Sequence, residues 1–248
     1  MIRVGITGNT GCLGMTLAAR IRGNRETNLI AFERSWFNEP EMLQHFVAHC
    51  DWIIHFAAIS RDGDGERLYQ TNMRLLEQLL AAVTTTQFSG VVALASTTRY
   101  AGKLPYHKSK RDGAALLLKT ATENAFRSSV LLFENAFAPG VLPDYNSVVS
   151  TFCANIAAGI ECKIDSDAQL TLLSAAEQMD QLMEKILAGN IPVTMTFKGA
   201  VHLSVSELKE KLEIMRTAIL NKQIPRFETR FEYELYTTLR AYCAGLAD

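Results

Sequence analysis

The feature that most constrains the fold of this chain is a glycine-rich turn that begins at its seventh residue. A short apolar segment, residues 2–6, leads into the sequence TGNTGCLG, after which apolar residues recur at helical spacing as Leu13, Leu17, Ala18 and Ile21. Strand, glycine turn and helix in this order form half of a β-α-β unit, whose helix start offers open N–H groups and a positive dipole to a diphosphate. The sequence therefore predicts a dinucleotide-binding site at this turn.

The spacing of the glycines gives each of them a separate task. Gly8 permits the tight turn, Gly11 lets a pyrophosphate approach the backbone, and Gly14 lets the helix lie close to the strand. The residues expected to line the cofactor here are Gly5, Thr7, Gly8, Asn9, Thr10, Gly11, Cys12, Leu13 and Gly14. The alternative is a glycine-rich connection that binds nothing.

Two charged residues bear on which dinucleotide would bind. Glu33 and Arg34 lie near the end of the second predicted strand, residues 28–35. An acid in this place usually holds the adenosine ribose of NAD, whereas a neighbouring arginine can pair with the additional phosphate of NADP. The sequence offers both, and both could equally be solvated surface charges.

Strand and helix patterns alternate through the first 140 residues. Further strands are predicted at residues 51–60, 90–97 and 128–140, and because only one helix separates the second strand from the third, one strand usual in such a sheet is missing. We predict an α/β fold in which residues 1–140 form a doubly wound parallel sheet, a Rossmann domain. Residues 141–248 are expected to form a smaller substrate-binding lobe packed on it.

Composition limits the partners of this fold. The 25 basic and 26 acidic residues give a net charge of −1 without a basic stripe, which disfavours nucleic acid or an anionic membrane and favours a small molecule or another protein. No apolar run approaches the roughly 20 residues of a membrane span, and the first 20 residues are too polar for a signal peptide, so we expect a cytoplasmic protein. The five scattered cysteines predict buried free thiols and no metal site.

The segment LPYHKSK, residues 104–110, carries the most specific indication of chemistry. In a helix that begins near Pro105, Tyr106 and Lys110 lie on one face about one turn apart. Lowering the pKa of the phenol from near 10 to near 7 would need roughly 4 kcal/mol, which a nearby ammonium and a nicotinamide ring could supply. Tyr106 would then protonate a ketone oxygen as hydride reaches the carbon, and Lys110 would hold the tyrosine and the cofactor ribose. The spacing alone is also common on surface helices.

The strand before this segment ends in three hydroxyl residues, Ser96, Thr97 and Thr98. A doubly wound sheet meets its ligands at the carboxyl ends of its strands, so one of these hydroxyls could donate a hydrogen bond to the same carbonyl oxygen. We expect Thr97 in this catalytic role first, and Ser96 second.

Together these pieces resemble the extended short-chain dehydrogenase/reductases, the NAD-dependent sugar-nucleotide epimerase and dehydratase group. The matching segments are TGxxGxxG, HFAA at residues 55–58, TN at residues 71–72, the hydroxyl-bearing strand end and YxxxK. The resemblance implies further cofactor-lining residues, namely His55, Ala57, Ala58 and Asn72. His55 is expected to be structural or cofactor-lining in preference to a base, and Asn72 could tie its helix to the catalytic strand or cap its own turn.

Later segments are similar to the reductase domain of capsular polysaccharide enzymes of the CapF type. These segments are PDYNSVVSTFCANIAAGI at residues 143–160, LTL at residues 170–172 and FEYELYTTLRAYC at residues 231–243. The resemblance implies reduction of a UDP-linked 4-keto-6-deoxy hexosamine for capsule or O-antigen, with NADP(H) favoured as cofactor and NAD(H) possible. It also implies that Thr98, Tyr145 and Asn146 lie near the sugar nucleotide and Asn135 near the nicotinamide.

The sequence departs from these relatives in three places. CapF-type enzymes continue into a cupin domain that handles epimerisation, and the 248 residues hold no counterpart of it, so any epimerisation is expected elsewhere or not at all. The usual arginine three residues before Asn135 is Leu132, and LSAAEQMDQL follows residue 172 in place of an aromatic-Val-Asp-Asp pattern. The exact sugar therefore stays open.

Two other functions compete with a reductase. An epimerase or dehydratase would keep NAD bound and recycle it, but a dehydratase needs an Asp–Glu pair beside the strand-end hydroxyl, and STTRYAG has none. A catalytically silent dinucleotide-binding scaffold typically loses the tyrosine or the lysine, whereas this chain keeps both. By resemblance, the helices that carry Asn72 and Tyr106 are expected to form the interface of a homodimer.

Overall fold

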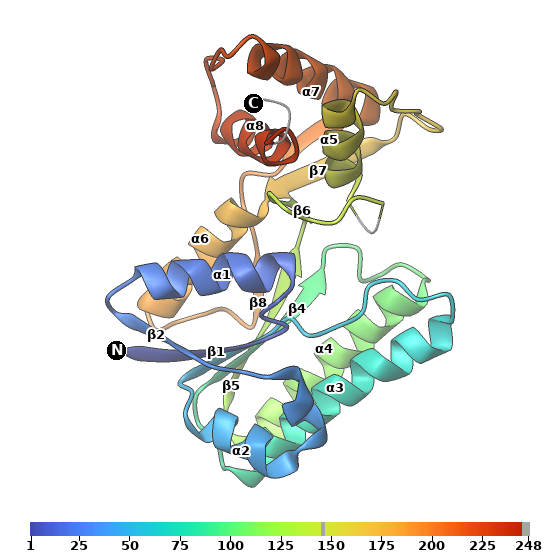
Figure 1. Ribbon diagram of the computed structural model, residues 1–248. Coiled ribbons are helices and arrows are strands. Elements are labelled where there is room, and N and C mark those ends of the chain that lie inside the picture. Colours follow the sequence, from blue (N-terminus) through green and yellow to red (C-terminus); the bar gives the residue numbers. More distant parts are fainter. Residues whose placement is uncertain (145–146, 245–248) are drawn as a thin grey trace. The chain divides into compact units, whose positions relative to one another are not determined.

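The computed structural model describes residues 1–144 and 147–244, which form two compact units (Figure 1). The first unit contains residues 1–133 and 179–197, and the second contains residues 134–178 and the chain from residue 198 onward. This division differs from the predicted single boundary at residue 140, because the chain leaves the first unit after Phe133 and later returns to it. Each unit has its own sheet and its own apolar core.

A six-stranded parallel sheet forms the centre of the first unit. The strands lie side by side in the order β2 (Thr27–Ile30), β1 (Ile2–Thr7), β3 (Trp52–His55), β4 (Val91–Thr97), β5 (Arg127–Phe133) and β8 (Thr194–Thr196). β3 is wholly buried and β4 nearly so, as expected of parallel strands that are covered on both faces. The strand order reverses between β1 and β3, which is the switch point where doubly wound sheets bind ligands. The predicted Rossmann fold is confirmed.

Helices cover both faces of this sheet. α1 (Cys12–Gly23) and most of α6 (Ala175–Leu187) lie on one face, and α2 (Pro40–Ala48), α3 (Gly65–Thr85) and α4 (Pro105–Asn124) lie on the other (Figure 1). Local sequence determines where these helices begin. Asp64 caps α3 by accepting bonds from the N–H groups of the second and third following residues, while α2 and α4 each begin at a proline, whose missing N–H is not needed there.

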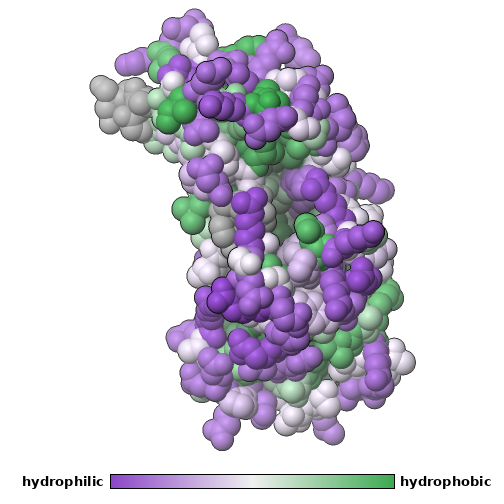
Figure 2. Space-filling view, turned by 90° about the vertical axis from the view of Figure 1, so that its right-hand side faces the viewer, coloured by the Kyte–Doolittle hydropathy of each residue, from purple (hydrophilic) through white to green (hydrophobic). Residues whose placement is uncertain are grey.

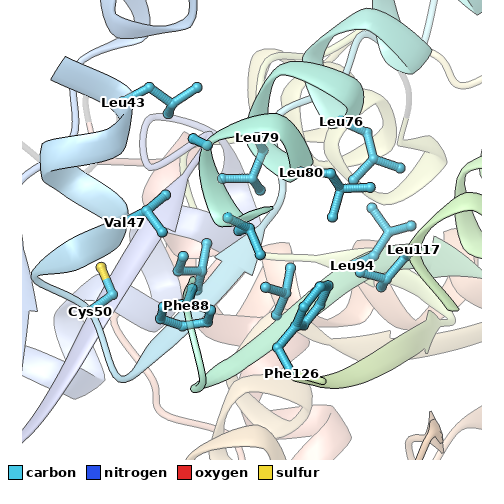
Figure 3. Close-up of a cluster of buried hydrophobic side chains, with 14 of the residues drawn as sticks. Leu43, Val47, Cys50, Leu76, Leu79, Leu80, Phe88, Leu94, Leu117 and Phe126 are labelled. Atoms are coloured by element: carbon cyan, nitrogen blue, oxygen red, sulfur yellow. The ribbon is translucent and has the colours of Figure 1, made fainter. Parts of the chain in front are cut away.

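One apolar core lies between the sheet and the helices α2, α3 and α4. Figure 3 shows side chains from all three helices meeting those of the sheet, among them Leu43, Val47, Leu76, Leu79, Leu94, Leu117 and Phe126. Figure 2 looks onto the side of the molecule where α3 and α4 begin, and its lower half is mostly hydrophilic with small apolar patches. The amphipathic packing fixes α4 against β4, and thereby positions the catalytic candidates that these two elements carry.

The second strand is shorter than the sequence predicts. β2 ends at Ile30, and Arg34 begins a 3-10 helix, η1 (Arg34–Asn38), with Glu33 as its N-cap residue. The two charged residues therefore lie beyond the strand and not within it. The segment from residue 31 to residue 51, all of which the structure describes, contains η1 and α2 but no strand, as predicted.

The second unit is built around a three-stranded sheet of β6 (Asn135–Phe137), β7 (Gln169–Ser174) and β9 (Val201–Ser204). Its helices are α5 (Val148–Ala158), α7 (Val205–Leu220) and α8 (Arg230–Tyr242). Ser204 and Glu207 form a capping box that begins α7, with both reciprocal bonds present. Within the described residues of both units, no helix has the length and apolar character needed to cross a membrane.

Candidate functional site

The three glycines of the turn between β1 and α1 differ in how tightly they are packed. Gly8 has a φ of +73°, and a Cβ added there would lie 2.6 Å from the backbone nitrogen of Ala57. A Cβ added at Gly14 would lie 2.3 Å from the carbonyl oxygen of Gly8, whereas at Gly11 the nearest atom is 3.5 Å away. Gly8 and Gly14 are therefore required by the turn itself, and Gly11 is required only if something else approaches the backbone.

The start of α1 is not capped by any side chain. Gly11 is its N-cap residue, no side chain caps the helix, and no acidic residue stands in its first turn, in a segment that the structure describes completely. Thr10 is exposed, while Cys12 and Leu13 are half-buried. Burial raises the pKa of the Cys12 thiol to about 11, so it stays protonated. Open N–H groups and an unopposed dipole fit a diphosphate at this position.

The glycine turn is also tied to the segment that follows β2. The Asn9 side-chain amide donates to the carbonyl oxygen of Phe32 at 3.1 Å. Glu33 and Arg34, the next two residues, are exposed. The bond therefore brings the candidate ribose and phosphate contacts next to the turn that would hold the diphosphate.

Three of the predicted cofactor residues lie inside the protein. A Cβ added at Gly5 would lie 2.4 Å from the Phe46 ring, so this glycine serves the packing of α2 on β1. Thr7 is completely buried, and its Oγ1 lies 2.8 Å from Nδ1 of His55. Burial, and to a smaller extent the charge of Lys110, lowers the pKa of His55 to about 3. His55 therefore stays neutral, buried and hydrogen-bonded to Thr7.

Tyr106 and Lys110 lie on the face of α4 that meets the sheet. Tyr106 is half-buried and Lys110 is 6% exposed. The Lys110 Nζ lies 5.5 Å from the centre of the Tyr106 ring and donates to the carbonyl oxygen of Ala95 in β4 at 2.9 Å. Burial lowers the pKa of Lys110 to about 8, because no carboxylate among the described residues pairs with it. The predicted pairing of these two side chains is thus present.

The pKa of Tyr106 moves in the opposite direction to the prediction. Burial raises it above its ordinary value of 10, and no effect of the nearby ammonium offsets this in the chain alone. The phenol is therefore protonated throughout the neutral range. A protonated phenol is the state that a proton donor needs, so the geometry suits reduction of a ketone.

The hydroxyls at the end of β4 point to different faces of the sheet. A Cβ added at Gly113 of α4 would meet the Leu94 side chain, so Leu94 faces α4, and strand alternation places Ser96 on that same face and Thr97 on the other. The Ser96 hydroxyl is buried and has no hydrogen-bond partner among the described residues. Thr97 Oγ1 accepts a bond from the Arg99 N–H at 3.2 Å. An unsatisfied buried hydroxyl beside α4 is available to a ligand.

A hydrogen-bond network that the sequence did not reveal holds the start of α4. The Oδ1 of Asn72 accepts from the Ile59 N–H at 2.8 Å, and its Nδ2 donates to Ile59 O at 3.0 Å and to Ser109 Oγ at 3.1 Å. Ser109 in turn donates to the carbonyl oxygen of Tyr106 at 2.8 Å. Both N–H groups of Asn72 are therefore used within the protein, which leaves none for a cofactor. Asn72 therefore ties α3 to the loop after β3 and to α4, and not to the catalytic strand β4 as predicted. The serine before Lys110 was the only sequence signal of this network.

The remaining predicted residues fall into three groups. Ala57 lies against the glycine turn, with Ala58 following it half-buried, and the Thr98 N–H donates to Phe133 O at 3.2 Å. Asn135 belongs to β6 of the second unit, where its amide donates to Thr171 O at 2.9 Å. The two predicted sugar contacts Tyr145 and Asn146 lie outside the described residues.

A groove beside Tyr106 was also not predicted. It is lined by residues 60–63 after β3, by Leu68 of α3, and by Leu104, Pro105 and Tyr106 at the start of α4. The position of Arg61 just after the HFAA segment, at the carboxyl end of a parallel strand, is the sequence signal that could have identified it.

Comparisons with known proteins agree with this geometry. Residues 4–180 match the NAD dependent epimerase/dehydratase family. The chain is 26% identical, over 246 residues, to the UDP-2-acetamido-2,6-beta-L-arabino-hexul-4-ose reductase of Pseudomonas aeruginosa. That alignment covers 97% of this chain and 65% of the relative, so the chain spans somewhat less than two thirds of the relative's length.

Solved structures show the same fold. The capsular polysaccharide assembling protein CapF from Staphylococcus aureus superposes with a TM-score of 0.83 at 24% identity, over 100% of this chain and 67% of that one. RMD from Pseudomonas aeruginosa, complexed with NADPH, has a TM-score of 0.79 at 19% identity, over 100% of this chain and 99% of that one. The family match covers more than half of the chain and includes the glycine turn, the hydroxyl-bearing end of β4 and the Tyr106–Lys110 pair. The chain belongs to the NAD-dependent epimerase/dehydratase family.

Proposed function

We propose that the protein is an NAD(P)H-dependent reductase that acts on the ketone of a nucleotide-linked 4-keto-6-deoxy sugar in surface polysaccharide biosynthesis. The observation that carries the proposal is the pairing of the protonated phenol of Tyr106 with the buried ammonium of Lys110, which is bonded to β4. The same strand carries the unpartnered hydroxyl of Ser96 on the face that α4 covers. The activity of the Pseudomonas aeruginosa relative, a UDP-2-acetamido-2,6-beta-L-arabino-hexul-4-ose reductase, supports the substrate class.

Each of these side chains has a separate role in the proposed reaction. NADPH, when bound, supplies the hydride. Tyr106 donates its proton to the ketone oxygen, and Ser96 donates a second hydrogen bond to the same oxygen. The side-chain directions on β4 favour Ser96 over Thr97, which reverses the order of the sequence-based prediction. Lys110 supplies positive charge beside the tyrosine and a donor for the cofactor ribose.

The glycine turn supports a dinucleotide as the cofactor. The uncapped start of α1 would hold the diphosphate, and the room at Gly11 would let it approach the backbone. Arg34 would pair with the additional phosphate of NADP, so we propose NADP(H) over NAD(H), with Glu33 as the competing ribose contact. We further propose a UDP-linked substrate, a homodimer, and action in the cytoplasm, where nucleotide-linked sugars are made.

The proposal is tested by replacing the phenol alone. Tyr106→Phe should lower kcat for NADPH oxidation with UDP-linked 4-keto sugars by about 10²–10⁴-fold, because the proton donor is lost while the ring is kept. The dissociation constant for NADPH, measured by fluorescence titration, should stay within about twofold. Tyr233→Phe, at an exposed tyrosine of α8, is the matched control and should behave as the wild type.

Two results would contradict the proposal. If the Tyr106→Phe protein turns over as fast as the wild type, Tyr106 is not the proton donor. Tightly retained NAD that exchanges no net hydride with any keto sugar would instead point to an epimerase of the same family.

A further inference from the structure

Two histidines at the end of α2 lie close enough to share a ligand. His45 stands in the last turn of this nine-residue helix, and His49 is its C-cap residue, whose dihedral angles are still helical. Their ring centres are 4.2 Å apart, and the ring planes are tilted by 34°. We infer that the two imidazoles form a chelating site for a divalent transition-metal ion, separate from the proposed reductase chemistry.

The hydrogen bond of His49 determines which of its ring nitrogens is open to a metal. Nδ1 of His49 lies 2.7 Å from the carbonyl oxygen of His45. A carbonyl oxygen only accepts, so Nδ1 carries the proton and Nε2 of the neutral ring keeps its lone pair. Histidines that bind metals almost always donate their other N–H in this way, which fixes the direction of the ring. His49 therefore has the hydrogen-bonding pattern of a metal ligand, with Nε2 as the donor atom.

The ring of His45 is the second donor. It forms no hydrogen bond with any described residue, so its lone pair is also open to a metal. Side chains four positions apart on a helix lie one above the other, which explains the contact of the two rings. Two nitrogens that bind one ion at about 2.1 Å each stand about 3–3.5 Å apart. Rotation of the stacked rings about their side-chain bonds is enough to bring both nitrogens to one ion.

The position of the pair on α2 leaves it accessible. The helix packs on the sheet through Leu43, Phe46 and Val47, each at most 2% exposed, whereas both histidines are exposed. The carboxyl end of a helix carries a partial negative charge, which favours a cation there. A metal ion can therefore bind at this end of α2 without displacing any core side chain.

The donor atoms determine which ions the site takes. Neutral imidazole nitrogens suit zinc, nickel and copper, whereas magnesium and calcium prefer oxygen ligands. Within the part of the chain that the structure describes, no group of three or more histidine, cysteine or acidic side chains is suited to a metal, so water fills the remaining positions around the ion. The five cysteines, from which no metal site was predicted, take no part in this one.

The experiment titrates Ni²⁺ into the untagged, metal-free protein and into three variants. His45→Gln and His49→Gln each remove one ligand, and His202→Gln, at an exposed histidine of β9, is the matched control. Calorimetry gives the dissociation constant and the number of ions bound per chain. Thermal unfolding without metal checks that all four proteins are folded, and with excess Ni²⁺ it reports binding to the folded state.

The wild type should bind one Ni²⁺ per chain. His45→Gln and His49→Gln should each bind it at least about tenfold more weakly, because a single imidazole loses the advantage of chelation. Ni²⁺ should raise the midpoint of thermal unfolding of the wild type and of His202→Gln, and should leave the midpoints of the two α2 variants nearly unchanged. The inference is overturned if the wild type binds no Ni²⁺, if fewer than both α2 substitutions weaken binding, or if His202→Gln weakens it equally.

Discussion

The glycines of the turn differ in whether the fold or a ligand requires them. Gly8 and Gly14 lack the space for a Cβ within the protein itself, whereas Gly11 has that space and stands at the uncapped start of α1. Lys110 shows a similar separation, because its ammonium is buried with one backbone acceptor and no carboxylate partner among the described residues. A buried ammonium without a carboxylate partner lowers the free energy of unfolding, so its presence is explained by a role in the reaction and not in the fold.

The glycines give a prediction that distinguishes binding from folding. Gly11→Ala should leave the midpoint of thermal unfolding nearly unchanged but weaken NADPH by at least about tenfold, since the added methyl would stand where the diphosphate approaches. Gly14→Ala should instead lower the free energy of unfolding by about 1–3 kcal/mol, because its Cβ meets the Gly8 carbonyl oxygen at 2.3 Å. Normal NADPH affinity in Gly11→Ala would argue against a dinucleotide at this turn.

Lys110 gives a prediction about stability and pH. Its pKa falls from 10.5 in the exposed group to about 8 in the folded protein, so burying the charge destabilises the fold fully below pH 8, and this cost fades as the pH rises toward 10.5. Lys110→Met should therefore be more stable than the wild type by on the order of 1 kcal/mol at pH 7, with the difference shrinking above pH 8, while reduction is lost. Urea unfolding at pH 7 and pH 10 measures the difference in free energy of unfolding between the two proteins. If Lys110→Met is less stable than the wild type at pH 7, burying the ammonium does not destabilise the fold.

At the scale of secondary-structure elements, the site depends on how α3 and α4 are attached to the sheet. The apolar layer of Figure 3 fixes α4 over β4, and the Asn72 network ties the loop after β3 to the first turn of α4. Tyr106 of α4 and Ser96 of β4 thus lie on the same side of the sheet because these two elements are held against each other. Neither element forms the site alone.

The Asn72 network yields a prediction at this scale. Asn72→Ala should lower the free energy of unfolding by about 1–3 kcal/mol, because the Ile59 N–H and carbonyl lose buried partners. It should also lower kcat more than it changes the affinity for NADPH, since Ser109, which bonds to the Tyr106 carbonyl oxygen, loses its bond to α3. Asn28→Ala, at an exposed asparagine of β2, is the control. A kcat equal to that of the wild type would show that the network does not position the tyrosine.

At the scale of the whole molecule, the chain is folded as two units whose sequences interleave. The segment from Met179 to Phe197 returns to the first unit and supplies β8, the edge strand beside β5, and most of α6. Phe197 stacks on Phe133 at 4.6 Å between ring centres, and Asp180 forms an ion pair with Arg20 of α1 at 2.9 Å. The first unit is therefore incomplete without residues far along the chain.

This interleaving predicts how truncation will behave. A chain cut after residue 140 should aggregate or unfold without cooperativity, because it exposes the edge of β5 and the apolar surface that α6 and β8 cover. A chain that ends at residue 197, with residues 134–178 replaced by a Gly-Ser linker, should recover a cooperative thermal transition. Cooperative unfolding of the shorter chain would show that β8 and α6 are dispensable.

Local patterns in the sequence were sufficient for the Rossmann fold and for the meeting of Tyr106 with Lys110. Buried parallel strands, helix starts at proline and the glycine spacing are each encoded within a few residues, so they can be recognised without knowledge of the rest of the chain. The shortened end of β2 and the short strands β7, β8 and β9 were missed, because three to six residues carry little periodic signal and are strands only through their partners.

Tertiary structure alone decided the rest. Four features depend on burial or on contacts between residues 13 or more positions apart. They are the direction of Ser96, the raised pKa of Tyr106, the hydrogen bonds of Asn72 and the groove at Arg61. Burial sets the cost of a charge and packing sets which hydroxyl is left unpaired, and neither is a property of a short segment. The sequence by itself determined which chemical groups are available, and the folded chain determined which of them face one another.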